Sequence, residues 1–124
     1  MSPRFFGSRP PYLPLSSRHD VLAFQTPPLD RAVEIAGPVT VELWASSSSV
    51  DTDFTAKLVD VYPASDDYPR GFAMNLCDGI MRAKFREPWE RVTPLEPGQP
   101  TRLRIQLYPT ANLFAKGHRI RLDI

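Results

Sequence analysis

Strict alternation of apolar and polar residues is the feature that most constrains how this chain can fold. Over 102–108, Leu and Ile occupy every second position between charged and polar residues. The same period of two recurs over 39–45 and 119–124. Successive side chains of a β-strand point to opposite faces, so this pattern places one face in a core and the other in water. Such alternation is typical of antiparallel sheets.

Weaker alternation predicts further strands along the chain. These segments are Val21–Gln25, Ala32–Ala36, Phe54–Tyr62, Phe72–Cys77 and Ile80–Arg86. Asp78-Gly79 separates two of them and is a typical hairpin-turn sequence. Val59 and Val61 fall on the face opposite Phe54, which indicates either a bulge or burial of that end on both faces. Because no segment has an apolar repeat at helical spacing, we predict an all-β sandwich or jelly roll.

Composition indicates where the folded domain begins. The 14 prolines cluster between the expected strands, since proline cannot donate to a sheet ladder. Residues 1–20 are rich in Pro, Ser and Arg and show little periodicity, so we predict an extended lead-in or linker there. Residues 21–124 then form the β-sandwich domain. A hydrophobic content of 42% is ordinary for a globular protein.

Charge and hydropathy exclude some classes of partner. The formal net charge is +1, which gives no general electrostatic reason to bind nucleic acid or an anionic membrane. No apolar run approaches the roughly 20 residues of a membrane span. The first residues are too polar for a signal peptide, so the expected compartment is the cytoplasm.

Residues that could carry catalysis are sparse. None of the six glycines precedes a serine by two positions, so the Gly-x-Ser-x-Gly elbow of α/β-hydrolases is absent. The run Ser46–Ser49 is read as a polar loop. His19 and His118 belong to no metal-spacing motif, and His118 is expected to bond to backbone near a turn. Cys77 is expected to be a small buried hydrophobe. We therefore predict no catalytic, cofactor-binding or metal-binding residue.

Two surface features leave alternatives open. Asp51-Thr52-Asp53 has the spaced carboxylates of calcium loops but lacks the glycine and distal glutamate of an EF-hand, so a local Asx-type turn is favoured. Trp44 lies on the polar face of its expected strand. An exposed tryptophan there, or Trp89, suits a sugar platform or a protein contact.

Four separated blocks together resemble a known family. They read GPVTVELW at 37–44, DTDFTAKLVDV at 51–61, NLCDGIMRAKFR at 75–86 and PTANLFAKGHRIRL at 109–122. The blocks are similar to the C-terminal domain of the Xaa-Pro dipeptidyl-peptidase and cocaine-esterase family of hydrolases. The resemblance implies a jelly-roll sandwich of the galactose-binding-like type, with a Ser-His-Asp triad supplied by a separate α/β-hydrolase domain. Family members continue beyond the counterpart of Ile124, which implies that the last strand or strands are absent here.

The resemblance favours one function over two others. We expect a non-catalytic accessory domain that braces an α/β-hydrolase catalytic domain and shapes its active-site entrance. The interface candidates, chosen as an aromatic side chain and charged residues, are Trp44, Asp51, Asp53, Asp78 and Arg82. The first alternative is a free-standing carbohydrate-binding module. The second is a homo-oligomer formed through a strand edge, either at Ile120–Ile124 or at its neighbour.

Overall fold

The computed structural model describes residues 15–88 and 90–124, which form six strands and two short 3₁₀ helices. The strands are β1 (Ala23–Gln25), β2 (Val33–Ala45), β3 (Asp53–Tyr62), β4 (Phe72–Arg82), β5 (Thr101–Phe114) and β6 (Arg119–Asp123). The helical turns are η2 (Leu15–Ser17) and η3 (Ala83–Phe85). The first part of the predicted linker, like Trp89, lies outside the described residues, and the domain boundary at residue 20 stays a prediction.

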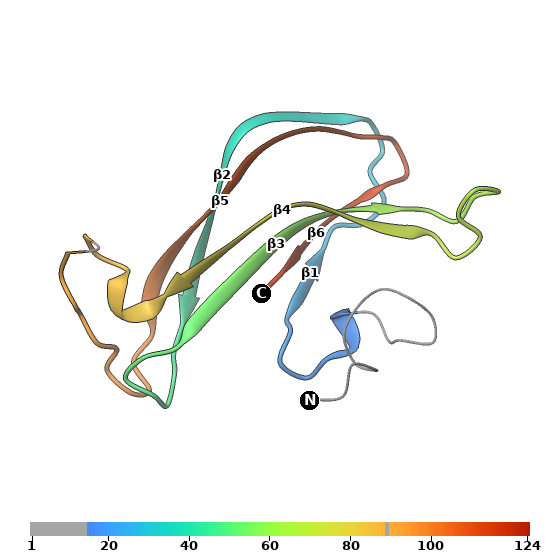
Figure 1. Ribbon diagram of the computed structural model, residues 1–124. Coiled ribbons are helices and arrows are strands. Elements are labelled where there is room, and N and C mark those ends of the chain that lie inside the picture. Colours follow the sequence, from blue (N-terminus) through green and yellow to red (C-terminus); the bar gives the residue numbers. More distant parts are fainter. Residues whose placement is uncertain (1–14, 89) are drawn as a thin grey trace.

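The strands form two antiparallel sheets. One sheet has the order β1-β6-β3-β4, and the other consists of β2 and β5 (Figure 1). The predicted all-β sandwich is therefore confirmed, while its galactose-binding-like type stays a prediction. Strand β6 is flanked by β1 and β3, so within the described residues its own edge is closed and its neighbour β1 forms the sheet edge.

Two strands are longer than their sequence pattern predicts. The segments expected at 32–36 and 39–45 are one strand, β2, and β5 continues past Pro109. The pairing of β2 with β5 shifts register between Gly37 and Val39, where Gly37 has a φ of +120°. A bulge there leaves Pro38 and Pro109 outside the regular ladder. A sheet tolerates proline, which has no N–H, at such a bulge.

The hairpin turn predicted at Asp78-Gly79 is wrong, because β4 runs straight through these residues. Gly79 pairs with Ala56 of β3 and has no positive φ. A Cβ atom on Gly79 would lie 2.3 Å from the backbone oxygen of Gln106 in β5. The glycine is thus required by the close approach of the two sheets at this point, which we call the sheet junction.

The end of β3 is buried on both faces, which was one of the two predicted explanations for the position of Val59, the other being a bulge in β3. Val59 is 3% exposed and Asp60 is fully buried. Leu58 pairs with Cys77 and Val59 pairs with Asn75, so the extra residue of the bulge is Leu76 in β4. The alternation of β3 itself therefore continues unbroken.

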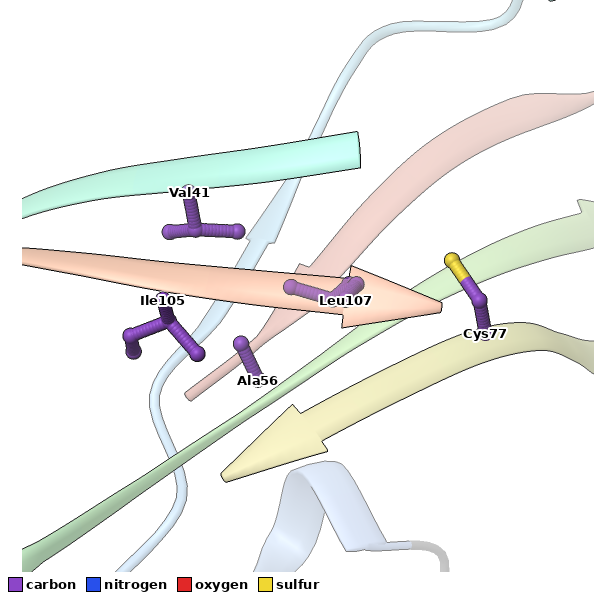
Figure 2. Close-up of a cluster of buried hydrophobic side chains, with 5 residues drawn as sticks. All are labelled: Val41, Ala56, Cys77, Ile105 and Leu107. Atoms are coloured by element: carbon purple, nitrogen blue, oxygen red, sulfur yellow. The ribbon is translucent and has the colours of Figure 1, made fainter. Parts of the chain in front are cut away.

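The core lies between the two sheets. A central cluster consists of Val41, Ala56, Cys77, Ile105 and Leu107, which reach it from β2, β3, β4 and β5 (Figure 2). The predicted alternation of β5 is confirmed, because its inward side chains are at most 4% exposed. Burial of a large aliphatic side chain stabilises a fold by about 1.5–3 kcal/mol. The prediction that Cys77 is a small buried hydrophobe is confirmed, and burial raises the pKa of its thiol.

One buried polar cluster ties β3 to β5 and β6. The Asp60 carboxylate accepts a hydrogen bond from the Asn112 amide at 3.0 Å, and its other oxygen lies 2.9 Å from Nδ1 of His118. The His118 ring packs against Tyr62, with ring centroids 4.3 Å apart. The expected backbone partner of the His118 side chain is wrong, since that partner is a buried carboxylate.

Candidate docking surface

Two long loops gather at one end of the sandwich. The loop 46–52 joins β2 to β3, and the segment 83–100 joins β4 to β5, so both loops lie where β3 begins and β4 ends (Figure 1). We call this region the loop end. It contains four of the five predicted interface residues: Trp44, Asp51, Asp53 and Arg82.

Asp53 and Arg82 form a bidentate ion pair at the loop end. The two residues are opposite each other in the β3–β4 ladder. Arg82 donates from Nε to one Asp53 carboxylate oxygen at 2.8 Å and from Nη2 to the other at 3.0 Å. The hydrogen bond from Arg82 holds the pKa of Asp53 below its usual value and raises that of Arg82. This geometry fixes both side chains on the outer face of the sheet.

Asp51 fastens the loop 46–52 to the turn that follows β4. Its carboxylate accepts a hydrogen bond from the Lys84 backbone N–H at 3.1 Å and lies 3.3 Å from the Lys84 ammonium. The backbone oxygen of Thr52 accepts from Ala83 at 2.9 Å. Asp51 thus bonds to Lys84, 33 residues away in the chain, and not within the favoured local Asx-type turn.

The segment 83–100 is held by side-chain and backbone hydrogen bonds. Arg86 donates to the backbone oxygens of Ala83, at 3.1 Å, and of Thr93. Between the loops, the Leu95 N–H donates to the Val50 oxygen at 2.7 Å. Leu95 itself is only 5% exposed, which anchors the segment against the fold. The described residues of both loops are therefore held in place by contacts within the chain.

Apolar side chains remain exposed on this ordered surface. Trp44 is 69% exposed, Val50 58% and Val92 57%, and Phe85 is exposed beside the Lys84 ammonium. The prediction that Trp44 lies on the polar face is confirmed. Apolar groups between fixed ion pairs are the composition that favours a protein contact.

Asp78 is the predicted candidate that lies elsewhere. It lines a groove of about 700 Å³ at the sheet junction, 4.0 Å from the Lys57 ammonium. The exposed side chains of Ile80 and Tyr108 flank this groove. No sequence pattern predicts this groove. The one signal for it is Gly79, because a glycine inside a strand can mark a close approach of two backbones as well as a turn.

Among residues 15–88 and 90–124, no group of three or more His, Cys, Asp and Glu side chains could hold a metal ion. The predicted polar loop at 46–49 is confirmed, since the Ser47 hydroxyl accepts a hydrogen bond from the Ser49 N–H at 3.0 Å. In the same described ranges, no helix is long and apolar enough to cross a membrane.

Two basic residues of the loop end, Lys84 and Arg86, are not among the predicted interface residues. The predicted strand at 80–86 is wrong beyond Arg82, because β4 ends there and the turn η3 follows. The turn aims Lys84 back at Asp51, a contact between segments that local alternation does not indicate.

Comparison with known proteins gives this geometry a context. Residues 5–124 match the family described as the X-Pro dipeptidyl-peptidase C-terminal non-catalytic domain. The chain is 44% identical over 111 residues to the cocaine esterase of Rhodococcus sp. (strain MB1 Bresler), covering 90% of this chain and 18% of the esterase.

Solved structures agree with this match. The chain is similar to an aminopeptidase from a marine sediment Thaumarchaeota archaeon, with a TM-score of 0.82 and 34% identity over 87% of this chain. It is also similar to an alpha-amino acid ester hydrolase, with a TM-score of 0.80 and 35% identity over 86% of this chain. It spans 18% of the length of each of these two proteins. The chain therefore belongs to the family of X-Pro dipeptidyl-peptidase C-terminal non-catalytic domains, which also includes the matching part of cocaine esterase.

Proposed function

We propose that this chain braces an α/β-hydrolase catalytic domain and helps to shape the entrance of its active site, with the loop end as the docking surface. The observation that carries the proposal is the ordered loop end, where exposed apolar side chains stand between fixed ion pairs. The chain covers only 18% of the cocaine esterase and of the aminopeptidase, which supports a partner that is the remainder of a larger hydrolase.

The order of the loop end favours a bracing role. A loop that must be ordered on binding loses conformational entropy, which weakens the contact. Here the ion pair of Asp53 with Arg82 and the contacts of Asp51 with Lys84 already fix the surface. A fixed wall beside an active site excludes water and positions substrate without moving during turnover.

A chimera tests the proposal. The matching C-terminal part of Rhodococcus cocaine esterase is replaced by this chain, and hydrolysis of the esterase's own ester substrate is measured. We expect Val92→Asp at the loop end to lower the hydrolysis rate and the melting temperature, because it places a charge in a dry contact.

Leu113→Asp is the matched control for this experiment. Leu113 is 59% exposed, close to the 57% of Val92, but it lies at the opposite end of β5. The control chimera should behave like the parent chimera. Equal effects of the two substitutions, or no effect of either, would contradict docking through the loop end.

A carbohydrate-binding module is the second candidate function, favoured by exposed aromatic side chains on one sheet face. Trp44 and Tyr108, 69% and 74% exposed, share the outer face of the β2–β5 sheet. Trp44 pairs with Arg102, so the two rings are about 20 Å apart along the strand. One sugar ring cannot span this distance, so only an oligosaccharide could contact both. Calorimetric titration with oligosaccharides tests this function, and heat that Trp44→Ala abolishes would support it.

A further inference from the structure

One methionine is exposed beside a hydroxyl donor, at the end of the fold where the turn 63–71 joins β3 to β4. Met74 of β4 is 39% exposed. Met81, near the other end of the same strand, is partly buried and packs against the central core cluster. Met74 therefore lies away from the loop end, which is the proposed docking surface.

The hydroxyl belongs to Tyr62, the last residue of β3. It donates a hydrogen bond to the Met74 sulfur across an O–S distance of 3.5 Å. Neighbouring rings hold the Tyr62 ring in place, since its centroid lies 5.9 Å from those of both Tyr68 and Phe72, in edge-to-face contact. Tyr68 and Phe72 in turn stack on each other, with centroids 5.0 Å apart. Aromatic pairs of these geometries attract each other, so the cluster keeps the hydroxyl against the sulfur.

We propose that Met74 is an oxidation site for peroxides, and that the Tyr62 hydroxyl donates to the sulfoxide oxygen that forms there. The thioether sulfur attacks one oxygen of hydrogen peroxide, so an S–O bond forms while the O–O bond breaks. The sulfur loses two electrons, and the second oxygen leaves as water after it takes up the proton of the transferred hydroxyl.

The Tyr62 hydroxyl suits the oxidised side chain better than the reduced one. A thioether sulfur is a weak hydrogen-bond acceptor, whereas a sulfoxide is polar and needs a donor. Because the hydroxyl already contacts the sulfur, it can bond to the new oxygen without a rearrangement of β3 or β4. Met81 would instead place its sulfoxide oxygen against the apolar core.

Peroxide treatment of the folded 124-residue chain tests which methionine reacts. The tryptic peptide 71–82 contains both Met74 and Met81, so fragment masses locate the added oxygen within one peptide. In the folded chain, Met74 should react severalfold faster than Met81, because its side chain is exposed and that of Met81 packs against the core. In urea the two rates should become equal. Equal rates in the folded chain, or faster oxidation of Met81, would overturn the proposal.

Two substitutions test the part played by the hydroxyl. Tyr62→Phe removes the donor to the sulfur and keeps the ring, and Tyr68→Phe is the matched control in the same aromatic cluster. Oxidation of Met74 should lower the melting temperature of Tyr62→Phe by about 2–6 °C more than that of the wild-type chain, because one hydrogen bond to the sulfoxide is missing.

The Tyr68→Phe control should respond to oxidation as the wild-type chain does. A wild-type chain and a Tyr62→Phe variant that lose the same melting temperature on oxidation would overturn the role of the hydroxyl. The same extra loss in Tyr62→Phe and Tyr68→Phe would also overturn it, since that result would reflect the aromatic cluster in general.

Discussion

Replacing Gly79 by alanine tests whether the two sheets meet where the structure places them. In the alanine variant, Cβ would lie 2.3 Å from the Gln106 oxygen and 3.1 Å from its carbonyl carbon. An ordinary contact begins near 3.4 Å, so the strands have to separate by about 1 Å at the sheet junction. The clashing atoms are backbone atoms, which cannot rotate away.

The expected cost follows from this overlap. Overpacked cores lose about 1–3 kcal/mol, and a clash with rigid backbone belongs at the upper end, so we expect a loss of about 3 kcal/mol. For a domain of this size, that corresponds to a melting temperature lower by about 10 °C or more. Because Gly79 has no positive φ, alanine fits its backbone conformation, and without the clash it would instead stabilise the fold by about 0.4–1 kcal/mol.

Whether Gly79→Ala lowers or raises the unfolding free energy therefore shows whether the clash is present. Urea unfolding of Gly79→Ala is compared with Ile80→Ala, whose side chain is 67% exposed and whose removal should change stability by less than about 0.5 kcal/mol. A Gly79→Ala variant as stable as the wild type, or more stable, would refute the close approach of β4 and β5.

Three further predictions concern single contacts. His118→Ala leaves the buried Asp60 carboxylate with one hydrogen-bond partner fewer, so it should lower the unfolding free energy by about 2–3 kcal/mol, measured by urea titration. A loss below about 1 kcal/mol would show that the fold does not depend on this contact. Arg82 lowers the pKa of Asp53 in the folded chain. The stabilisation by this pair should therefore be complete above the unfolded-chain pKa of about 3.9 and should disappear as the pH falls through the lower folded pKa. An Arg82→Ala variant with the same acid-unfolding curve as the wild type would contradict this prediction. The buried Cys77 thiol, whose pKa is raised, should react with a thiol reagent at neutral pH only on unfolding, and rapid labelling of the native chain would show that it is accessible.

Local alternation predicted the strands well where one face is buried. The pattern over 102–108 identified β5, and the pattern at 119–124 identified β6, because side-chain periodicity reports directly on burial. It was misled at Asp78-Gly79, since a glycine needed for a close approach of strands looks the same in sequence as one needed for a turn. Alternation did not predict that β5 continues past Pro109, because the proline lies at a bulge, where it does not pair in the ladder.

The candidate site was predicted only in part, for a related reason. Asp53 and Arg82 are interface candidates because of their charge, but their pairing depends on the β3–β4 register, which joins residues 29 positions apart. The role of Lys84 depends on where β4 ends, and the sequence contains no break there. Contacts between segments follow from tertiary packing, so residue type and spacing alone indicate the surface but not its geometry.

Hydrogen exchange tests the docking surface most directly. Amide exchange is measured for the isolated chain and for the same chain within the cocaine-esterase chimera. We expect amides of the loops 46–52 and 83–100 to exchange more slowly in the chimera, and amides of the β3–β4 turn at 63–71 to exchange at the same rate in both proteins. Slower exchange confined to 63–71, or exchange identical in the two proteins, would contradict docking through the loop end.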